Sequence, residues 1–417
     1  MKKSTATLLF SVSCFCAALL FGCSAKTDDT DQSTNETTTT EKENAVTYAK
    51  TILVSADLTA KEGEQYATLT DAFEYVNENS PKSEEERIRI LVSPGTYREH
   101  LILKAPYVTL EGDTEDAEEV LLTWYYGCGR NYHSITAELS NPDSASVRIT
   151  EEAHDFIGTH VTFENSYSLY VTEEEKTDYS EDNSVTLEQR EMDVMNSKFK
   201  KQALALCLEG DRAVFTNCRF IGVQDTLLLN NYARCYLKDC FIEGTTDFIF
   251  GSATAVFDGC QINVPFRNGY LTASSAEITA PYGFLFTDCT LTREARYEGM
   301  EAPEDESCTL GRPWNALCQV IFWNCKMDSH IIAGEDRYVN MTSDYSRTDC
   351  RLFEGNSMDL NGNKLDLSSI LPDYMKELTE EEYTASYTPE KHLAAKYDPD
   401  TKQLLEADGW EPEGLTQ

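Results

Sequence analysis

The sequence has few basic residues. Only 35 lysines and arginines stand against 72 aspartates and glutamates, which gives a formal charge of −37. Nucleic acid is disfavoured as a partner, since its phosphates would be repelled, and so is tight binding to any other polyanion. A neutral substrate, or one whose charge is masked, agrees better with this balance. The alternative is that the excess acid only keeps a secreted protein soluble.

The chain also lacks a hydrophobic segment long enough to predict a membrane-spanning helix. Its N-terminal apolar run, from Ala6 to Phe21, follows two lysines and has the form of a secretory signal. The run ends in Leu20-Phe21-Gly22-Cys23, which resembles the lipobox of bacterial lipoproteins, where the cysteine is acylated and becomes the mature N-terminus. An ordinary signal that is cleaved elsewhere is the alternative.

Residues 23–45 have no apolar periodicity and are rich in threonine and acid. Such a segment cannot bury enough surface to fold, so we interpret it as a flexible tether. The predicted organisation is a lipoprotein signal over 1–22, the tether over 23–45 and one folded domain over 46–417. The expected location is extracellular or in the cell envelope, with a membrane anchor formed by lipid on Cys23.

No pair of the 14 cysteines has the C-x-x-C spacing of zinc or redox sites, and no other cluster of metal ligands is recognisable. Cys14 and Cys16 would be removed with the signal, and Cys23 would carry lipid. Eleven cysteines then remain, so at least one of them cannot form a disulfide within the chain.

Several segments of the sequence resemble one another. Each has an apolar stretch, a turn-forming residue, a cysteine and then alternating apolar residues. The matching cysteines are Cys218, Cys240, Cys260, Cys289 and Cys325, and Ser166 is expected in the same place in an earlier segment.

The steps between these cysteines are 22, 20, 29 and 36 residues. A period in the low twenties, built from short β-rich runs and Asn/Asp/Gly turns, is typical of a solenoid. Helices are disfavoured because Val, Ile, Phe and Thr dominate, and the frame of leucine-rich repeats is absent. The pattern predicts an all-β fold, a right-handed single-stranded parallel β-helix. Its cysteines would form a buried column, and the longer coils would project loops that wall a groove.

The same step of 22 residues separates Asp225 from Asp247, and Gln202 from Gln224. Neighbouring strands lie about 4.8 Å apart, so the two carboxylates are expected within about 5 Å of each other. Like charges this close raise one pKa, which is typical of an acid/base or nucleophile pair. Two aspartates that only cap turns are the alternative. A retaining glycosidase has a similar pair, but amide donors beside it suit an oxyanion and favour ester hydrolysis.

Five motifs resemble those of pectinesterases, also called pectin methylesterases, and they occur in that family's order over roughly residues 46–355. They are Gly95-Thr96-Tyr97-Arg98-Glu99, Gln202-Ala203-Leu204-Ala205-Leu206, Gln224-Asp225-Thr226-Leu227, Asp247-Phe248-Ile249-Phe250-Gly251 and Leu310-Gly311-Arg312-Pro313-Trp314. The resemblance implies a right-handed parallel β-helix enzyme that hydrolyses the methyl esters of pectin. It also implies a monomer that needs no metal and no organic cofactor.

The resemblance further implies a role for each matching residue. Asp247 is the expected nucleophile, and Asp225 is the acid that protonates departing methanol and then the base for water. Gln202 and Gln224 are the expected oxyanion donors. Arg312 is expected to hold Asp247 ionised and to lower its pKa, while the pKa of Asp225 stays raised.

Substrate contacts are expected mainly from aromatic residues close to these motifs: Trp314, Phe250, Thr246 and Trp124. For Trp124 and the two tyrosines after it, packing against the edge of a coil is the alternative. Residues 132–150 and 293–308 diverge from the family and are expected to form groove loops. The tail, residues 370–417, contains helix-like segments such as Pro372–Glu382. We expect the tail to pack over the last coils and cap the open end of the solenoid.

Two other functions remain open at this stage. A polysaccharide lyase or glycosidase can use the same fold, although a lyase usually holds calcium between clustered acids. A non-catalytic pectin-binding protein would keep the groove but lose one of the five catalytic residues, and all five are present. Release of methanol without scission of the polysaccharide distinguishes an esterase from both.

Overall fold

The computed structural model describes residues 46–192, 202–265, 269–294, 307–314 and 317–415. Contacts divide the chain into residues 1–43 and 44–417, and every described residue belongs to the second unit. The predicted signal peptide, Cys23 and the tether lie outside the described residues. Within the described part, no helix is both long enough and apolar enough to cross a bilayer.

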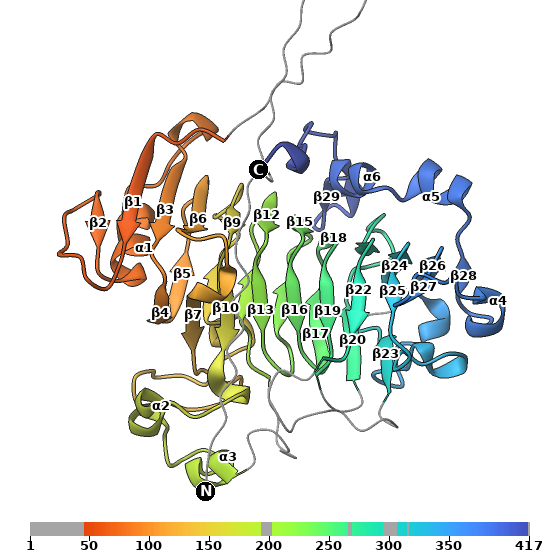
Figure 1. Cartoon of the computed structure of the whole chain (residues 1–417), viewed down its shortest axis with the longest axis horizontal. Coiled ribbons are helices and arrows are strands. Elements are labelled where there is room, and N and C mark those ends of the chain that lie inside the picture. Colours follow the sequence, from red (N-terminus) through yellow and green to blue (C-terminus); the bar gives the residue numbers. More distant parts are fainter. Residues whose placement is uncertain (1–45, 193–201, 266–268, 295–306, 315–316, 416–417) are drawn as a thin grey trace, which may run out of the picture. The chain divides into compact units, whose positions relative to one another are not determined.

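Short parallel strands form three sheets, here named A, B and C, and successive coils of the chain visit the sheets in turn (Figure 1). Sheet A contains, in spatial order, β2 (Gln65–Tyr66), β1 (Lys50–Val54), β3 (Ile88–Val92), β6 (Val108–Gly112), β9 (Ile157–Thr159), β12 (Ala213–Thr216), β15 (Arg234–Lys238), β18 (Thr254–Asp258), β21 (Phe284–Thr287), β24 (Gln319–Trp323), β26 (Arg351–Gly355) and β28 (Lys376–Glu377). Sheet B contains β27 (Met358–Asp359), β25 (Lys326–Met327), β22 (Thr290–Thr292), β19 (Gln261–Asn263), β16 (Phe241–Glu243), β13 (Arg219–Ile221), β10 (Thr162–Asn165), β7 (Val120–Trp124) and β4 (Gly95–Arg98). Sheet C contains β23 (Cys308–Gly311), β20 (Gly269–Ser274), β17 (Thr246–Gly251), β14 (Leu227–Leu229), β11 (Leu206–Leu208), β8 (Val147–Ile149) and β5 (Leu101–Leu103). The predicted parallel β-helix is confirmed.

Short helices and a hairpin accompany the coils: α1 (Leu69–Glu78), α2 (Glu173–Asp178), α3 (Leu187–Met192), α4 (Leu367–Ile370), α5 (Glu380–Ser386), α6 (Pro389–Ala394), and the antiparallel pair β29 (Tyr397–Asp398) and β30 (Gln403–Leu404). Helix α1 was not expected from the repeat pattern. It is capped by Thr68, the residue before it, whose side chain accepts a hydrogen bond from the backbone N of Asp71. Its buried residues, Leu69, Ala72, Phe73 and Val76, have helical spacing. They join the interior cluster of the first coils, so α1 covers the N-terminal end of the β-helix.

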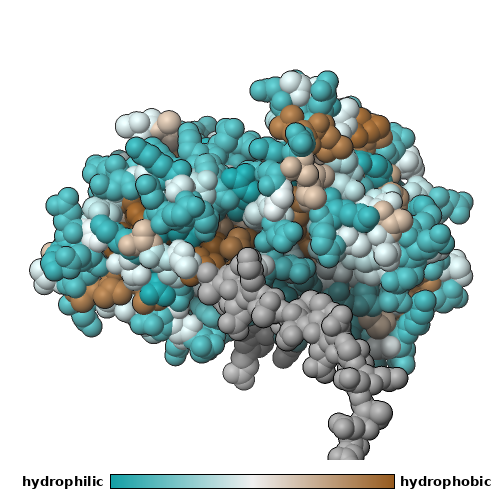
Figure 2. Space-filling view, turned by 90° about the horizontal axis from the view of Figure 1, so that it is seen from above, coloured by the Kyte–Doolittle hydropathy of each residue, from teal (hydrophilic) through white to brown (hydrophobic). Residues whose placement is uncertain are grey.

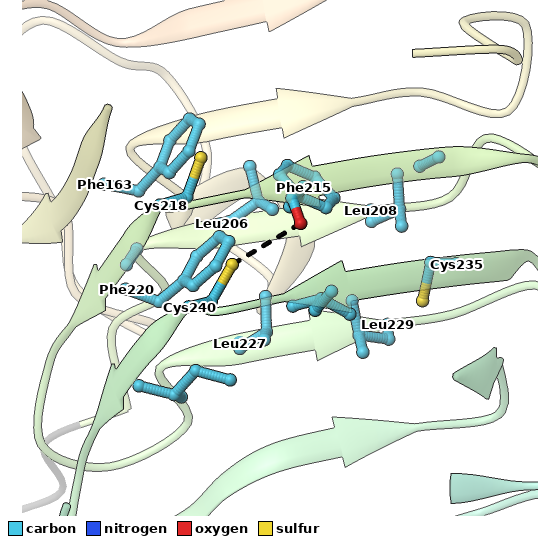
Figure 3. Packing of buried hydrophobic residues seen from close by; sticks show 14 of the residues in the cluster. Phe163, Leu206, Leu208, Phe215, Cys218, Phe220, Leu227, Leu229, Cys235 and Cys240 are labelled. Atoms are coloured by element: carbon cyan, nitrogen blue, oxygen red, sulfur yellow. Dashed lines mark hydrogen bonds between the residues drawn. The ribbon is translucent and has the colours of Figure 1, made fainter. Parts of the chain in front are cut away.

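The predicted column of cysteines lies inside the β-helix. Cys218, Cys240, Cys260, Cys289 and Cys325 are at most 2% exposed, and all eleven described cysteines are free thiols. Figure 3 shows two of them among phenylalanine and leucine side chains, with the Sγ of Cys240 donating to the backbone O of Phe215 at 3.6 Å. Column-forming thiols therefore act here as small hydrophobic residues.

The residue before each of these cysteines has a left-handed backbone, with φ between 51° and 64° at Asn217, Asp239, Gly259, Asp288 and Asn324. Asparagine, aspartate and glycine adopt this conformation more readily than other residues. The recurring Asn/Asp/Gly-Cys pair in the sequence thus marks the bend between sheet A and sheet B.

Ser166 was wrongly assigned to the cysteine column. Thr162 pairs with Arg219, so Val161 occupies the position equivalent to Cys218. The backbone N of Arg219 donates to the O of Val161 at 3.0 Å, just as the N of Phe241 donates to the O of Cys218 at 2.9 Å. The left-handed residue of that coil is His160, with φ of 53°. Because histidine is a weak turn signal, Asn165-Ser166 was mistaken for the bend.

The helix expected at Pro372–Glu382 was also wrong. Lys376–Glu377 form β28, which pairs with β26 and extends sheet A, and α5 begins only at Glu380, after a capping box at Thr379. The tail then returns over the outer face of sheet A, where α5 and α6 lie above the strands (Figure 1). Tyr383 of α5 stacks on Trp323, with ring centroids 4.1 Å apart.

This return path has a physical cause. The outer face of sheet A carries an apolar row across successive coils: Val214, Tyr236, Val256, Leu285 and Ile321. The tail removes that row from water, so it covers the outer face of the middle and later coils and adds β28 to the end of sheet A. With the tail in place, the surface seen from this side is mostly hydrophilic, with small hydrophobic patches (Figure 2).

A stack of phenylalanines provides a test of this interior. Phe286 lies between Phe257 and Phe322, with ring centroids 4.3 and 4.5 Å away, and all three are fully buried. We expect Phe286→Ala to lower the free energy of unfolding by about 3–5 kcal/mol, because it opens a cavity that the stack cannot refill. Ile278→Ala, at a residue 56% exposed, should change it by less than about 0.5 kcal/mol. Urea unfolding measures both, and equal effects would contradict the assigned interior.

Candidate active site

A row of polar side chains crosses sheet C at one register position. Gln202 pairs with Gln224, Gln224 pairs with Thr246, and Thr246 pairs with Tyr270. All four are partly exposed, so the row faces outward from the β-helix. The step of 22 residues therefore means one coil, as predicted.

Asp225 and Asp247 follow directly after Gln224 and Thr246 in this row. Both have a left-handed backbone, with φ of 61° and 51°, and the pairing of β17 with β20 shifts register at the same point. Phe248 and Ile249 return at once to the core and are fully buried. The backbone N of Asp225 donates to the O of Thr246 at 3.0 Å, which holds the two aspartates on neighbouring coils, one strand spacing of about 4.8 Å apart.

Arg312 binds both carboxylate oxygens of Asp247. Its Nε donates to Oδ1 at 2.7 Å and its Nη2 donates to Oδ2 at 2.5 Å. The backbone N of Arg312 donates to the O of Thr272 at 2.9 Å, and the guanidinium carbon lies 4.3 Å from the ring centroid of Tyr270. This two-pronged contact fixes the orientation of the carboxylate as well as its charge.

Asp225 has different partners. Its Oδ2 accepts hydrogen bonds from Nε2 of Gln202 at 2.9 Å and from Nδ2 of Asn141 at 3.2 Å. Both donors are neutral amides, so no cation contacts this carboxylate directly among the described residues. Asp225 is only 3% exposed. Burial, followed by the charge of Asp247, raises the pKa of Asp225 to about 7.

The pKa of Asp247 differs from the sequence-based expectation. Burial raises it above its usual value, although the hydrogen bonds and charge of Arg312 act in the opposite direction. Asp247 is 6% exposed, and at this depth the loss of hydration outweighs the guanidinium. Arg312 thus limits the increase in the pKa of Asp247 but does not lower this pKa below its usual value.

The rings expected to contact substrate are placed unequally. Trp314 is 43% exposed, whereas Phe250 is 3% exposed, and their ring centroids lie 5.9 Å apart. Phe250 therefore packs against Trp314, and Trp314 offers the accessible ring. Gly251 ends β17 with φ of 115°, and a Cβ there would lie 1.9 Å from the backbone O of Leu229, so this position requires glycine.

Trp124 belongs to an aromatic cluster beside the row. Its partly buried ring stacks on Tyr125 at a centroid distance of 4.3 Å. The same cluster includes Ala203, the residue after Gln202. Most of the ring of Trp124 therefore packs at the edge of a coil, which is the alternative considered above. Substrate contact by Trp124 stays a prediction.

Comparisons with known proteins agree with this geometry. The family model described as Pectinesterase matches residues 176–347, which include all five predicted catalytic residues. Pectinesterase 31 of Arabidopsis thaliana is 30% identical over 270 residues, which are 64% of this chain and 71% of that relative. The chain belongs to the pectinesterase family. It is therefore a carboxylic ester hydrolase.

Other members of the pectinesterase family extend the likeness. Pectinesterase A of Dickeya chrysanthemi is 27% identical over 341 residues, covering 74% of this chain and 83% of the relative. The structure of pectin methylesterase PemA from Erwinia chrysanthemi has a TM-score of 0.61 at 24% identity and covers 85% of this chain and 98% of its own. A pectin methylesterase solved in complex with a hexasaccharide has the same TM-score at 26% identity, with the same coverage of 85% and 98%.

Two neighbours of the pectinesterase site were missed by sequence reasoning. Tyr270 could have been found by stepping one coil beyond Thr246, but that coil differs in length from the one before it. Asn141 lies on the loop 132–150, which was expected only to border the groove, and nothing in its spacing relates it to Asp225. Of the second predicted groove loop, 293–308, residues 295–306 lie outside the described residues.

The raised pKa of Asp225 predicts a stability change with a definite sign. The usual pKa of this carboxyl group is 3.8, and its pKa in the folded protein is about 7. Its ionisation therefore lowers the free energy of unfolding progressively as the pH rises from 3.8 to 7, and the full loss persists above pH 7. We expect Asp225→Asn to stabilise the protein by on the order of 4 kcal/mol at about pH 8 and by far less near pH 4.5.

Thermal unfolding at the two pH values measures this difference. Asp211→Asn is the matched control. Burial acts to raise the pKa of Asp211, but its hydrogen bonds and charge pairing with Arg234 lower that pKa below its usual value, so this substitution should destabilise the protein at both pH values. Equal stabilisation by Asp225→Asn at both pH values would show that this carboxyl titrates normally.

Proposed function

We propose that this pectinesterase hydrolyses the methyl esters of pectin, a homogalacturonan, to methanol and free carboxylates. The observation that carries the proposal is the pairing of two buried aspartates with unequal partners: Asp247 is held by Arg312, and Asp225 by neutral amides. Arg312 keeps Asp247 available as an anion, whereas the pKa of Asp225 lies near neutral pH. This is the division that an aspartate nucleophile and an aspartate acid require.

In the first half of the reaction, a carboxylate oxygen of Asp247 attacks the ester carbonyl and forms a tetrahedral intermediate. The row that contains Gln202 and Gln224 supplies side-chain N–H donors for the oxyanion. Nε2 of Gln202 carries two hydrogens and uses one on Asp225, so a second is available. As the intermediate collapses, protonated Asp225 gives its proton to the departing methoxide. Methanol leaves, and the galacturonyl group remains on Asp247 as an anhydride.

In the second half, Asp225 is ionised and takes a proton from water, which attacks the anhydride carbonyl. Collapse of this intermediate releases the galacturonic acid, which loses the remaining proton of the water molecule to solvent, and returns Asp247 as a carboxylate to its contact with Arg312. The proton stays on Asp225, so the cycle closes without another reactant. The raised pKa of Asp225 suits both duties, because a group that titrates near neutral pH exchanges protons in either direction.

The charge of the molecule supports the choice of substrate. A methyl ester is neutral, and its hydrolysis adds a negative charge to the sugar beside two aspartates. The chain carries a formal charge of −37, which disfavours retention of the anionic product. The exposed ring of Trp314 offers an apolar surface for the sugar.

Removal of the nucleophile tests the reaction. Asp247→Ala should lower the rate of methanol release from highly methylated pectin at least about 10⁴-fold, while Asp373→Ala, at an exposed position, should retain full activity. Methanol and acidification are followed together with reducing and unsaturated ends. Chain scission without methanol would overturn the esterase proposal and favour a lyase or glycosidase. Binding without any product would favour a non-catalytic role.

We further propose that the enzyme is a lipoprotein held at a membrane of the cell envelope by acyl chains on Cys23. The support is the N-terminal signal pattern, the lipobox-like Leu20-Phe21-Gly22-Cys23 and the polar segment 24–45. A tether of this kind would let the catalytic domain reach a polymer outside the cell.

Fractionation of expressing cells tests the anchor. The full chain should sediment with membranes and incorporate labelled fatty acid, and Cys23→Ser should abolish the labelling. Cys350→Ser, which alters a thiol of the folded domain, should remain labelled and membrane-bound. Unchanged labelling of Cys23→Ser would refute the lipid anchor.

A further inference from the structure

Asn141 contacts the catalytic pair from outside the coils. Its Nδ2 donates to Oδ2 of Asp225 at 3.2 Å, beside the hydrogen bond of 2.9 Å from Gln202 to the same oxygen. Within the described part of the chain, no hydrogen bond reaches Oδ1 of Asp225. The two carboxyl oxygens are therefore unequal.

This inequality decides which oxygen carries the proton. An oxygen that accepts two N–H donors has used its lone-pair directions and is the carbonyl-like oxygen of the protonated acid. The proton of neutral Asp225 then resides on Oδ1. That oxygen is the one left to face a leaving group or a water molecule.

The loop holds Asn141 firmly in this position. The backbone O of Asn141 accepts from the N and Oγ of Ser144, at 3.1 and 2.8 Å. Two residues further along, Asp143 accepts from Arg148 of β8 at 2.8 Å, and Arg148 also donates to Glu209 at 2.9 Å. The amide is thus anchored to sheet C through its neighbours.

A role in stability alone does not explain this side chain. The other polar atom of the amide, Oδ1 of Asn141, is buried and has no hydrogen-bond partner. A buried acceptor left unsatisfied destabilises a fold, so selection for stability would favour another residue here. Its one satisfied contact is with the catalytic acid.

We propose that Asn141 is a positioning residue for Asp225. With Gln202 it fixes the carboxyl plane, places the transferable proton on Oδ1 and stabilises the ionised form that acts as base toward water. This inference rests on the proposed esterase mechanism and adds a residue to it.

The charges around Asp225 set the expected pH response. Asp247 on β17 raises the pKa of Asp225, while Arg312 after β23 and the amides of Gln202 and Asn141 lower it. On the loop itself, Asp143 forms an ion pair with Arg148, which it shares with Glu209. Removing the Asn141 donor should therefore raise the pKa of Asp225 further, by about one pH unit.

The test uses the purified full chain and three variants. Asn141→Ala removes the donor, Asn141→Asp keeps the size but replaces the donor with a carboxylate, and Ser140→Ala alters the same loop without touching Asp225. We expect kcat/KM for methylated pectin to fall about tenfold or more for Asn141→Ala and further for Asn141→Asp. The alkaline limb of the pH profile should move upward by about one unit in Asn141→Ala. Ser140→Ala should leave both unchanged.

A second measurement needs no activity. The stability gained by Asp225→Asn is followed against pH with and without Asn141→Ala. This gain grows between the unfolded and the folded pKa of Asp225 and is constant above the folded value, so the pH at which the plateau begins reports the folded pKa. An upward shift of that pH supports the proposal. Reduced activity with an unmoved limb and an unmoved plateau would overturn it and leave Asn141 a structural role. If the unaltered chain released no methanol at all, the esterase mechanism itself would fail, whatever the plateau did.

Discussion

Parallel hydrogen bonds between neighbouring coils hold equivalent residues about 4.8 Å apart, and the site depends on this register. Gln202 pairs with Gln224, and Gln224 pairs with Thr246. Because Asp225 and Asp247 directly follow Gln224 and Thr246, this pairing places the two aspartates side by side. The buried residues on the same coils maintain the register, since Leu227 pairs with Ile249 and both are fully buried. A slip of one residue would turn these apolar side chains outward and an aspartate inward.

The register creates an unfavourable arrangement that the rest of the site moderates. Two carboxylates on adjacent coils lose hydration and repel each other. Arg312 compensates Asp247 with charge and two hydrogen bonds, whereas the described side chains that donate to Asp225 are amides. The same residue type thus acquires two chemical roles from its neighbours. The left-handed backbone at both positions adds strain, and the packed interior of phenylalanines and cysteines supplies the stability that tolerates it.

The sheets that matter most for function have different outer faces. The apolar row outside sheet A is covered by the returning tail, while sheet C keeps a partly exposed polar row flanked by the loop that carries Asn141. The aromatic cluster around Tyr125 and Tyr132 adjoins the start of that row through Ala203. Sheet C thus presents the predicted catalytic side chains on a partly exposed face, where the proposed substrate would reach them.

The sequence alone determined the repeat, the cysteine column, the coil length of 22 residues and the juxtaposition of Asp225 with Asp247. All of these depend on periodicity, and a periodic backbone turns equal spacing into spatial contact. Only the tertiary structure decided the features without a period. Asn141 reaches Asp225 from a loop 84 residues away, and Phe250 lies buried against Trp314. In the tail, Lys376–Glu377 form a strand of sheet A where a helix was expected, and α5 and α6 lie over the outer face of that sheet. The net rise of the Asp247 pKa also depends on the tertiary structure. It results from hydration lost on burial, which the spacing of residues in the sequence does not predict.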